Sequence, residues 1–439
     1  MPISNFPAAL QPAIQLNYLE REFEEGLHSV LSYRSIAKRE KFPNHIGETI
    51  TKTRHGLKLP VTTPLVPNTN TNLDNGLTPS TWTIEQWVMG INMYGDTIDL
   101  NTVTEKVGIA EQFLINAKVS GIQAAQSLDR IARNALFAAY MGGNTFVTAT
   151  LGVPGNTVHV DNINGFNQGY VNGVAQGVSG AAPLTIVIGG DTYNVTGAAA
   201  DPVNTSTTPG GVSGNLTLAT NATVADATTG NVASSSANNG TGPTVLRPNG
   251  RAATGALIGT DLLTMSSLLD AVAYLRSNAV PTIDGKYNVY ADPTAARELF
   301  ADPAFQLLYR GQGATGPFAS GTITELVDVR IISTTEAFQQ TLGAIKVHRT
   351  IVCGFGALIE GDFEGMAAQE TPQDVGLIKM VDDIVMVVRE PLDRLQQIIA
   401  QSWYWIGGFS VPTDATANPA VLPTASTSVY KRAVLIEHS

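Results

Sequence analysis

The chain has 439 residues, of which 43% are hydrophobic and 14% are charged, and its formal net charge is −11. Globular domains usually carry about 25% charged residues, so this surface is poor in charge, as in proteins that neighbouring copies cover. The acidic balance excludes a basic footprint for nucleic acid over the whole protein. Cys353 is the single cysteine, which excludes a disulfide within the chain. Without an apolar run of 18 residues or a signal-like N-terminus, we expect no membrane span and no secretion.

Residues 16–41 have the period of one amphipathic helix, which Pro43 would end. The sequence leaves open whether this helix packs on its own domain or lies as an arm across a neighbouring copy. Residues 46–94 predict an extended excursion, with strands at 48–63 and 82–94 around a turn-rich tip at 64–79. A two-stranded ribbon is marginal alone in water, which favours contact with another subunit. The apolar stripe of the helix is Leu16, Leu19, Phe23, Leu27, Val30, Tyr33 and Ala37.

Residues 102–141 give the clearest signal, an unbroken apolar stripe with steps of three and four residues. Thr102 and Glu105 form a capping box, and Gly142 with Gly143 provides a C-terminal stop. A helix of this length spans about 60 Å. The stripe is rich in Ala and Gly, so we expect another element to pack closely against it. A coiled coil is the alternative, but the stripe has few Leu or Ile side chains for it.

Residues 142–246 contain no Lys, Arg or Glu and only four Asp. Short β-like runs at 146–151, 184–188 and 216–218 favour a small all-β module over a disordered linker. An α/β pattern then returns. It predicts helices at 262–276, preceded by Thr260 and Asp261, and at 293–300, capped by Asp292. The predicted strands are 287–290, 329–332, 346–352, 375–389, 397–409 and 429–436.

Signals for catalysis or metal binding are weak. Residues 311–316 match a dinucleotide fingerprint in their letters, but a helix-like segment precedes them where a strand is required, so a loop is expected. The six histidines have no metal spacing, and residues 161–165 lack ligands that a calcium loop needs. Cys353 lies in an apolar strand and is expected to be inert. We therefore predict no enzyme, no catalytic residue, no cofactor and no metal site.

A basic stretch lies between residues 34 and 58, where seven cations accompany two glutamates. It is open whether this stretch is a solvated face, attracts an acidic surface of a neighbouring copy, or contacts DNA. We take the second interpretation and predict contacts between subunits. The candidate contact residues are Leu16, Leu19, Phe23, Arg34, Lys38, Arg39, Lys41, Lys52, Arg54 and Lys58.

The order of these parts resembles the Hong Kong 97-type shell fold of tailed-bacteriophage major capsid proteins. Tyr94-Gly95-Asp96 before the long helix is similar to the element that closes the extended loop in one branch of that family. Residues 284–293, with a strand and an Asp-Pro helix start, are also similar, as are 329–336, 356–358 and the pair 389–392 and 403–405. The resemblance covers about three quarters of the chain, and residues 142–255 have no counterpart in it.

The resemblance implies an α+β fold with an inserted all-β domain. The implied parts are an N-terminal arm (1–45), an extended β loop (46–85), a peripheral-domain strand and spine helix (86–146), an inserted β-rich domain (147–255), an axial α/β domain (256–375) and returning peripheral strands (376–439). The insert is expected to be a separate domain that projects from the outer face of the shell.

The function that the resemblance implies is that of a structural subunit of an icosahedral capsid. Such a subunit self-assembles into hexamers and pentamers and encloses double-stranded DNA without sequence-specific binding or contact with a membrane. Portal, scaffolding and cement proteins are further candidate partners. The expected location is the virion, after assembly in the host cytoplasm. The alternative is a cell-surface or adhesive binding protein whose β-rich module recognises a ligand.

Overall fold

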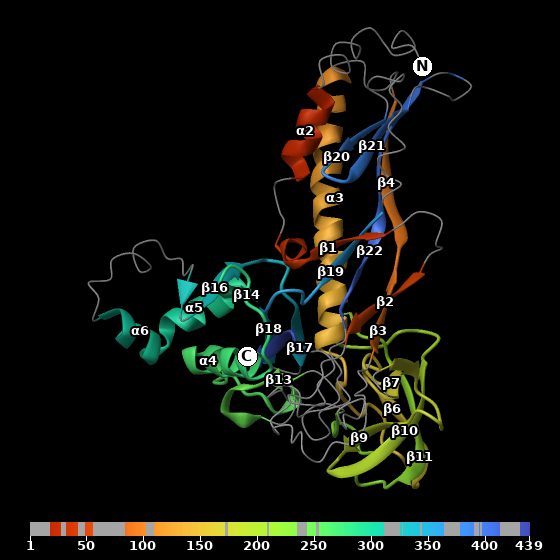
Figure 1. Ribbon diagram of the computed structural model, residues 1–439, viewed down its shortest axis with the longest axis vertical. Helices are drawn as coiled ribbons and strands as arrows, with labels where there is room; N and C mark the ends of the chain where they lie inside the picture. The colour runs from red at the N-terminus through yellow and green to blue at the C-terminus, as the bar shows by residue number, and fades with distance from the viewer. Residues whose placement is uncertain are drawn as a thin grey trace, which may run out of the picture. The chain divides into compact units, whose positions relative to one another are not determined.

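The computed structural model describes residues 18–27, 32–42, 49–55, 84–101, 109–171, 174–208, 210–234, 244–251, 254–310, 325–326, 328–342, 345–363, 378–389, 395, 397–412 and 431–439 (Figure 1). The chain forms two compact units. The first contains residues 1–50, 88–135 and 358–410, and the second contains 51–87, 136–357 and 411–439. Each unit therefore combines segments that lie far apart in the sequence.

The first unit is built on a six-stranded sheet in which β22 (Ile398–Ser410) is the central strand. β4 (Asn92–Asn101) is antiparallel to β22 over ten residues. Along the other edge of β22 lie β21 (Ile384–Arg389) and β19 (Ile359–Phe363). The sheet ends with β20 (Ile378–Val381), which pairs with β21, and with β1 (Lys38–Phe42), which is parallel to β19.

The predicted spine helix is confirmed as one element, α3 (Ile109–Tyr140), with 32 residues and a length of about 48 Å. Residues 102–108, which include the proposed cap, lie outside the described part. Buried side chains of α3, among them Phe113 and Leu128, share a hydrophobic core with Trp403 and Trp405 of β22. The long apolar stripe is therefore covered by the sheet.

A second helix, α2 (Tyr18–Leu27), packs closely against α3 through two glycines. A Cβ atom on Gly121 would lie 2.4 Å from the carbonyl oxygen of Phe23, and one on Gly26 would lie 2.5 Å from that of Lys118. Real Cβ atoms do not come this close to backbone atoms, so both positions require glycine for this packing. The close neighbour predicted from the Ala- and Gly-rich stripe is thus α2.

The prediction of one helix over 16–41 is wrong from residue 32 onward. After α2 the described chain forms a short 3-10 turn, η2 (Arg34–Ile36), and then the strand β1. The buried carboxylate of Asp129 on α3 accepts hydrogen bonds from the backbone N–H groups of Ser32, Tyr33 and Arg34, at 3.1, 2.7 and 3.1 Å. These tertiary hydrogen bonds and the pairing of β1 with β19 outweigh the local helical pattern.

The second unit contains a mixed sheet with β23 (Ala433–His438) and β18 (Ile345–Cys353) at its centre. Beyond β18 lie β14 (Tyr287–Ala291), β16 (Val329–Ser333) and β15 (Glu325–Leu326), and β17 (Gln339–Leu342) also pairs with β18. β13 (Val245–Leu246) is parallel to β23. The helices are α4 (Met265–Ser277), α5 (Pro293–Ala301) and α6 (Pro303–Arg310).

The predicted cap of α5 is confirmed, because Asp292 Oδ1 accepts a hydrogen bond from Ala295 N at 2.8 Å. The start of α4 is later than expected, because Thr264 is its N-cap. Asp261 instead accepts hydrogen bonds from Asn249 and Arg251. The single strand expected at 375–389 is a hairpin of β20 and β21, whose turn residues Asp382 and Asp383 have φ of 47° and 66°.

The described part of residues 144–234 is built from strands, in agreement with the predicted all-β module. Six strands form one antiparallel sheet in the order β5-β12-β9-β10-β11-β6, with a core of its own around Ile186 and Val195. Their bounds are β5 Asn144–Phe146, β6 Gly155–Val160, β9 Leu184–Ile188, β10 Asp191–Ala200, β11 Gly214–Ala222 and β12 Val232–Ser234. We call residues 144–234 the insert.

Two expectations for the insert need correction. Its sheet begins at Asn144, and the segment from Val245 already belongs to the mixed sheet, so the boundaries 147 and 255 are displaced. The insert is also attached to the α/β region of the same compact unit, because Gln340 Nε2 donates to Thr207 Oγ at 3.0 Å.

The extended excursion is described in part, and its tip at 64–79 lies outside the described residues. β2 (Thr49–His55) and β3 (Ile84–Gly90) confirm strands on both sides of the tip. They form a four-stranded sheet with β7 (Gln168–Val171) and β8 (Val174–Gly177) of the insert. The excursion and the insert therefore share one sheet. The α+β class predicted from the sequence is confirmed.

Candidate functional site

Some of the predicted contact residues are buried in the structure and others are exposed. Leu16 and Lys58 lie outside the described residues, and Arg54 is described only by its place in β2. Lys52, also on β2, is half-buried.

The expectation that Leu19 and Phe23 contact a neighbouring copy is wrong for the subunit as folded here. Their exposed fractions are 3% and 0%, and both belong to the core that α2 shares with α3 and the sheet. The apolar face of the helix is therefore satisfied within its own subunit. This outcome corresponds to the first of the two alternatives that the sequence left open.

Arg34 is also buried within its own subunit, with 7% of its surface exposed. Its guanidinium donates to the carboxylate of Glu360 on β19, from Nε at 3.1 Å and from Nη2 at 2.6 Å. A buried arginine with a two-pronged carboxylate partner is not available to another chain. Arg34 therefore holds η2 against β19, which corrects its assignment as a contact between subunits.

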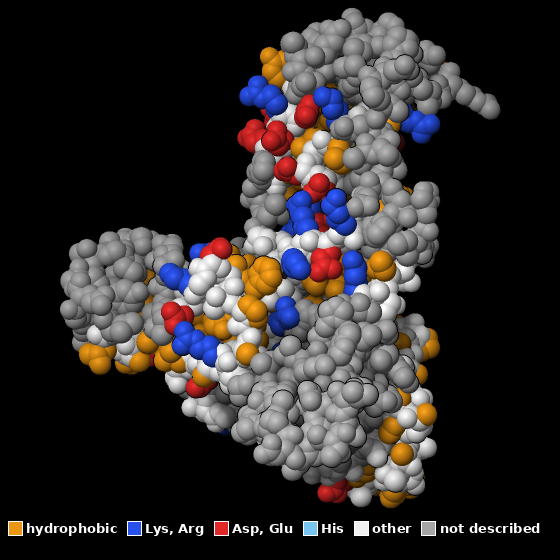
Figure 2. Space-filling model, viewed as in Figure 1, with side chains coloured by type: hydrophobic (Ala, Val, Ile, Leu, Met, Phe, Trp, Pro, Cys, Tyr) orange, Lys and Arg blue, Asp and Glu red, His pale blue; other side chains and the backbone are white. Residues whose placement is uncertain are grey.

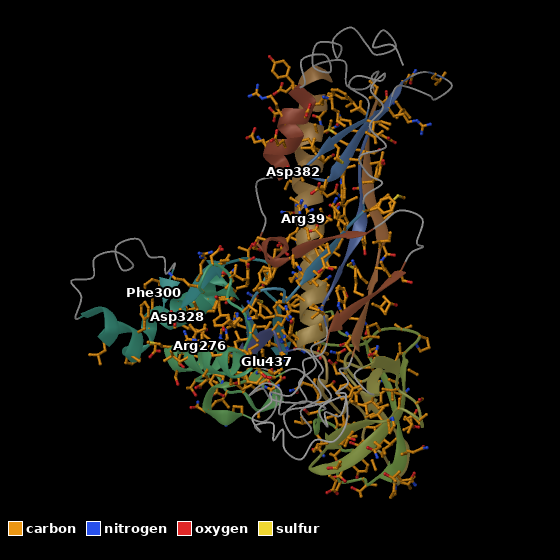
Figure 3. All side chains as sticks on the ribbon, viewed as in Figure 1. Arg39, Arg276, Phe300, Asp328, Asp382 and Glu437 are labelled. Carbon is orange, nitrogen blue, oxygen red and sulfur yellow. The ribbon has the colours of Figure 1, made fainter. Side chains whose placement is uncertain are left out.

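Three basic residues remain exposed, namely Lys38, Arg39 and Lys41 on β1. β1 is an edge strand, and charged side chains on an edge strand discourage uncontrolled pairing with other chains. Lys38 pairs with Glu40 at 3.3 Å, and Arg39, which Figure 3 labels, pairs with Asp383. The basic strand is thus partly compensated by carboxylates of its own chain, which the sequence alone could not pair with it.

A further carboxyl group near β1 is that of Asp362, which is the partner of Lys41 in the register of β1 and β19. Burial raises the pKa of Asp362, and the nearby negative charge of Asp383 raises it further. The charges around β1 are therefore densely packed and of both signs, so their balance is sensitive to any further charged surface.

The acidic helix α2 is a feature that the sequence analysis did not single out. Glu25 pairs with Lys118 at 2.8 Å, and Glu20 pairs with Lys379 at 2.9 Å. Figure 2 shows acidic side chains over α2 and basic side chains over β1 within the first unit. The sequence YLEREFEEGL carries the signal, since its glutamates flank the apolar stripe.

The second unit contains a buried charged cluster that no sequence motif indicated. Glu437 on β23 accepts from Arg247 Nε at 2.8 Å and from Arg349 Nε at 3.1 Å, and all three side chains are at most 4% exposed. Burial opposes ionisation of Glu437, but the two arginine charges outweigh it and lower its pKa to about 2. Arg349 of β18 and Glu437 of β23 are direct partners in the register of the sheet, and Arg247 directly follows β13.

The weak catalytic and metal signals have structural explanations where they are described. Asp161, in the calcium-like loop, accepts from Thr207 N at 2.7 Å and from Thr208 Oγ at 2.7 Å, so protein donors occupy its oxygens. No group of three His, Cys, Asp or Glu side chains in the described ranges is arranged to hold a metal ion. Residues 311–316 lie outside these ranges. Cys353 is fully buried, and burial raises the pKa of its thiol.

None of the helices in the described segments is long and apolar enough to cross a membrane.

Comparison with protein-family models gives no match, and no curated protein matches the chain. Among solved structures, the chain is similar to the capsid of the cyanophage P-SCSP1u, with 13% identity, a TM-score of 0.49, and coverage of 93% of this chain and 88% of that chain. It is similar to the capsid of Ralstonia phage GP4, with 10% identity, a TM-score of 0.47 and the same coverage. A structure of Mycobacterium phage Che8 matches with 8% identity, a TM-score of 0.44, and coverage of 93% and 91%.

Proposed function

We propose that the chain is a structural subunit that assembles into the icosahedral shell of a tailed bacteriophage. One observation carries the proposal: the long helix α3 lies on a sheet made of β1 and β4, which precede it, and of strands from beyond residue 358. An N-terminal helix and a β excursion come before this helix, and an α/β region follows it. This is the order of parts on which the resemblance to Hong Kong 97-type capsid proteins rests.

In this proposal the protein works by assembly and has no catalytic role. Hexamers and pentamers of the chain form the shell, which encloses double-stranded DNA without reading its sequence. Weak contacts suffice, because each subunit makes many of them and their strengths combine. Portal, scaffolding and cement proteins are candidate partners, and assembly in a host cytoplasm precedes the virion.

The exposed basic strand β1 is the proposed contact with neighbouring copies. Lys38, Arg39 and Lys41 remain from the original set, because they alone among its described residues are both basic and exposed. The pairs of Lys38 with Glu40 and of Arg39 with Asp383 are exposed, and such pairs contribute about 0–1 kcal/mol each. An acidic surface of a second copy, for which α2 is a candidate, can therefore compete for them at little cost.

Negative-stain microscopy of the purified full chain tests the function directly, since shells or capsomers are expected. Replacing Lys38, Arg39 and Lys41 by Gln should reduce assembly and its dependence on salt, because screening weakens exposed charge pairs. The control variant replaces three cations of the second unit, Arg276, Lys286 and Lys346, and loses the same charge. Monomers only from the wild type would contradict the function, and equal losses in both variants would contradict the role of β1.

The insert is proposed to project from the outer face of the shell. Its described strands carry few charges, which suits a surface that contacts no DNA. Replacing residues 144–243 by a short Gly/Ser linker keeps β13 in the mixed sheet and tests this proposal. Shells of normal diameter with less density outside would support it. Folded subunits without shells would show that the insert is needed for assembly.

A further inference from the structure

A cavity of about 170 Å³ lies within the second unit, between the insert and the mixed sheet. One water molecule needs about 10–15 Å³ of such volume, so there is room for a larger guest. The insert contributes Asn144 and Thr208 to the wall, and the mixed sheet contributes Arg349 and Glu437. Its wall therefore combines polar groups from two separate sheets with apolar side chains such as Phe146 and Leu435.

The charges in its wall do not balance. Arg247 and Arg349 face one carboxylate, that of Glu437, which also accepts from Thr254 Oγ at 2.8 Å. With side-chain exposures of 4%, 1% and 4%, the three charged groups are shielded from water. Glu437 remains ionised at neutral pH, because its pKa is about 2. Among these three charged groups one more is positive than negative, and a buried excess charge is unfavourable without a counter-charge.

The excess charge is associated with one free donor. Arg349 donates through Nε to Glu437 and through Nη2 to Gln340, whereas its Nη1 has no hydrogen-bond partner within the described residues. A buried N–H group without an acceptor is unfavourable, and more so when the group is charged. Gln340 connects through Thr207 to a further carboxylate, that of Asp161. The oxygens of Asp161 already accept hydrogen bonds from donors of residues 206–208.

We infer that this cavity binds a small oxyanion of the phosphate class, with Arg349 Nη1 as its central donor. A guanidinium donates in a fixed planar fork that fits the oxygens of such an anion. The bound anion supplies the missing negative charge and links the insert to the mixed sheet. This inference is independent of the assembly function.

Equilibrium dialysis of the full chain against labelled inorganic phosphate, at constant ionic strength set with chloride, measures the site. The expected result is saturable binding of one phosphate per chain. Arg349→Met should lower the affinity at least tenfold, while it leaves Arg247 and Glu437 as a neutral pair. The control Arg276→Met removes an exposed arginine of the same unit and should bind like the wild type.

A second variant keeps every charge and fills the space. A Cβ atom on Gly255, which lines the cavity, would meet no atom within 4 Å, so Gly255→Val should fold and should also lower the affinity. The rise of the melting temperature with phosphate is a second measurement. Phosphate raises the stability of many proteins through exclusion from their surface, so this rise is compared between the variants. Absence of saturable binding to the wild type, or equal binding to all variants, would overturn the inference and leave a cavity that holds only water.

Discussion

The packing of α2 on α3 makes a prediction whose sign is informative, for the substitution Gly121→Ala. In a free helix this change stabilises by about 1 kcal/mol, because alanine has the higher helix propensity. In the folded subunit the new Cβ atom would lie 2.4 Å from the carbonyl oxygen of Phe23. Since the obstacle is backbone, α2 must move, and overpacking of this kind costs about 1–3 kcal/mol. The two effects together predict a net loss of up to about 2 kcal/mol.

Urea unfolding followed by tryptophan fluorescence measures this change, because Trp403 and Trp405 belong to the affected core. The control Asn134→Ala introduces alanine at an exposed position of the same helix and should stabilise by a few tenths of a kcal/mol. A gain of about 1 kcal/mol from Gly121→Ala would show that α2 does not lie on α3 in the isolated subunit, and would refute the reasoning.

Three further predictions concern buried groups. Asp129→Ala should lower the free energy of unfolding by about 3 kcal/mol and speed trypsin cleavage after Arg34, because the N–H groups of residues 32–34 lose their acceptor. Asp129→Asn should cost less. Equal cleavage rates would argue against the role of Asp129 in fixing residues 32–34. The pKa of Glu437 falls from 4.5 to about 2 on folding, so its contribution of about 3 kcal/mol is present above pH 4.5 and is lost as the pH falls towards 2. The difference in unfolding free energy between wild type and Glu437→Gln should therefore shrink between pH 5 and about pH 2.5, and a constant difference would contradict the assignment. Cys353 should resist thiol reagents in the native protein and react in urea, because burial raises the pKa of its thiol; rapid native labelling would count against its place in the core.

The sequence predicts elements well where one local pattern dominates. The stripe of α3 and the Asp292 cap of α5 are of this kind, because periodicity and capping are properties of neighbouring residues. The sequence-based prediction fails before β1, where the local pattern favours a helix. Asp129, nearly a hundred residues away, fixes a turn at residues 32–34 instead. The pairing of Arg34 with Glu360 is equally inaccessible, since the two residues are 326 positions apart.

The same limit applies to the candidate sites. A run of cations is visible in the sequence, but which of them are buried depends on strands that pair from distant segments. The cluster around Glu437 has no motif, because its members come from positions 247, 349 and 437. Residues 245–251 were assigned to the insert from composition, although two of them pair with β23.

The six-stranded sheet of the first unit and the mixed sheet of the second unit each depend on a late segment of the chain for a central strand. β22 joins β4 to the rest of the first sheet, and β23 joins β13 to β18 in the second. During synthesis, at about 5–20 residues per second, α3 emerges long before either strand. Its apolar stripe therefore stays uncovered until β22 is made. A nascent chain interrupted before residue 398 can close neither sheet. Translation of most of the chain thus precedes completion of these two cores, and an unfinished chain stays recognisable to the proteases and chaperones that remove it.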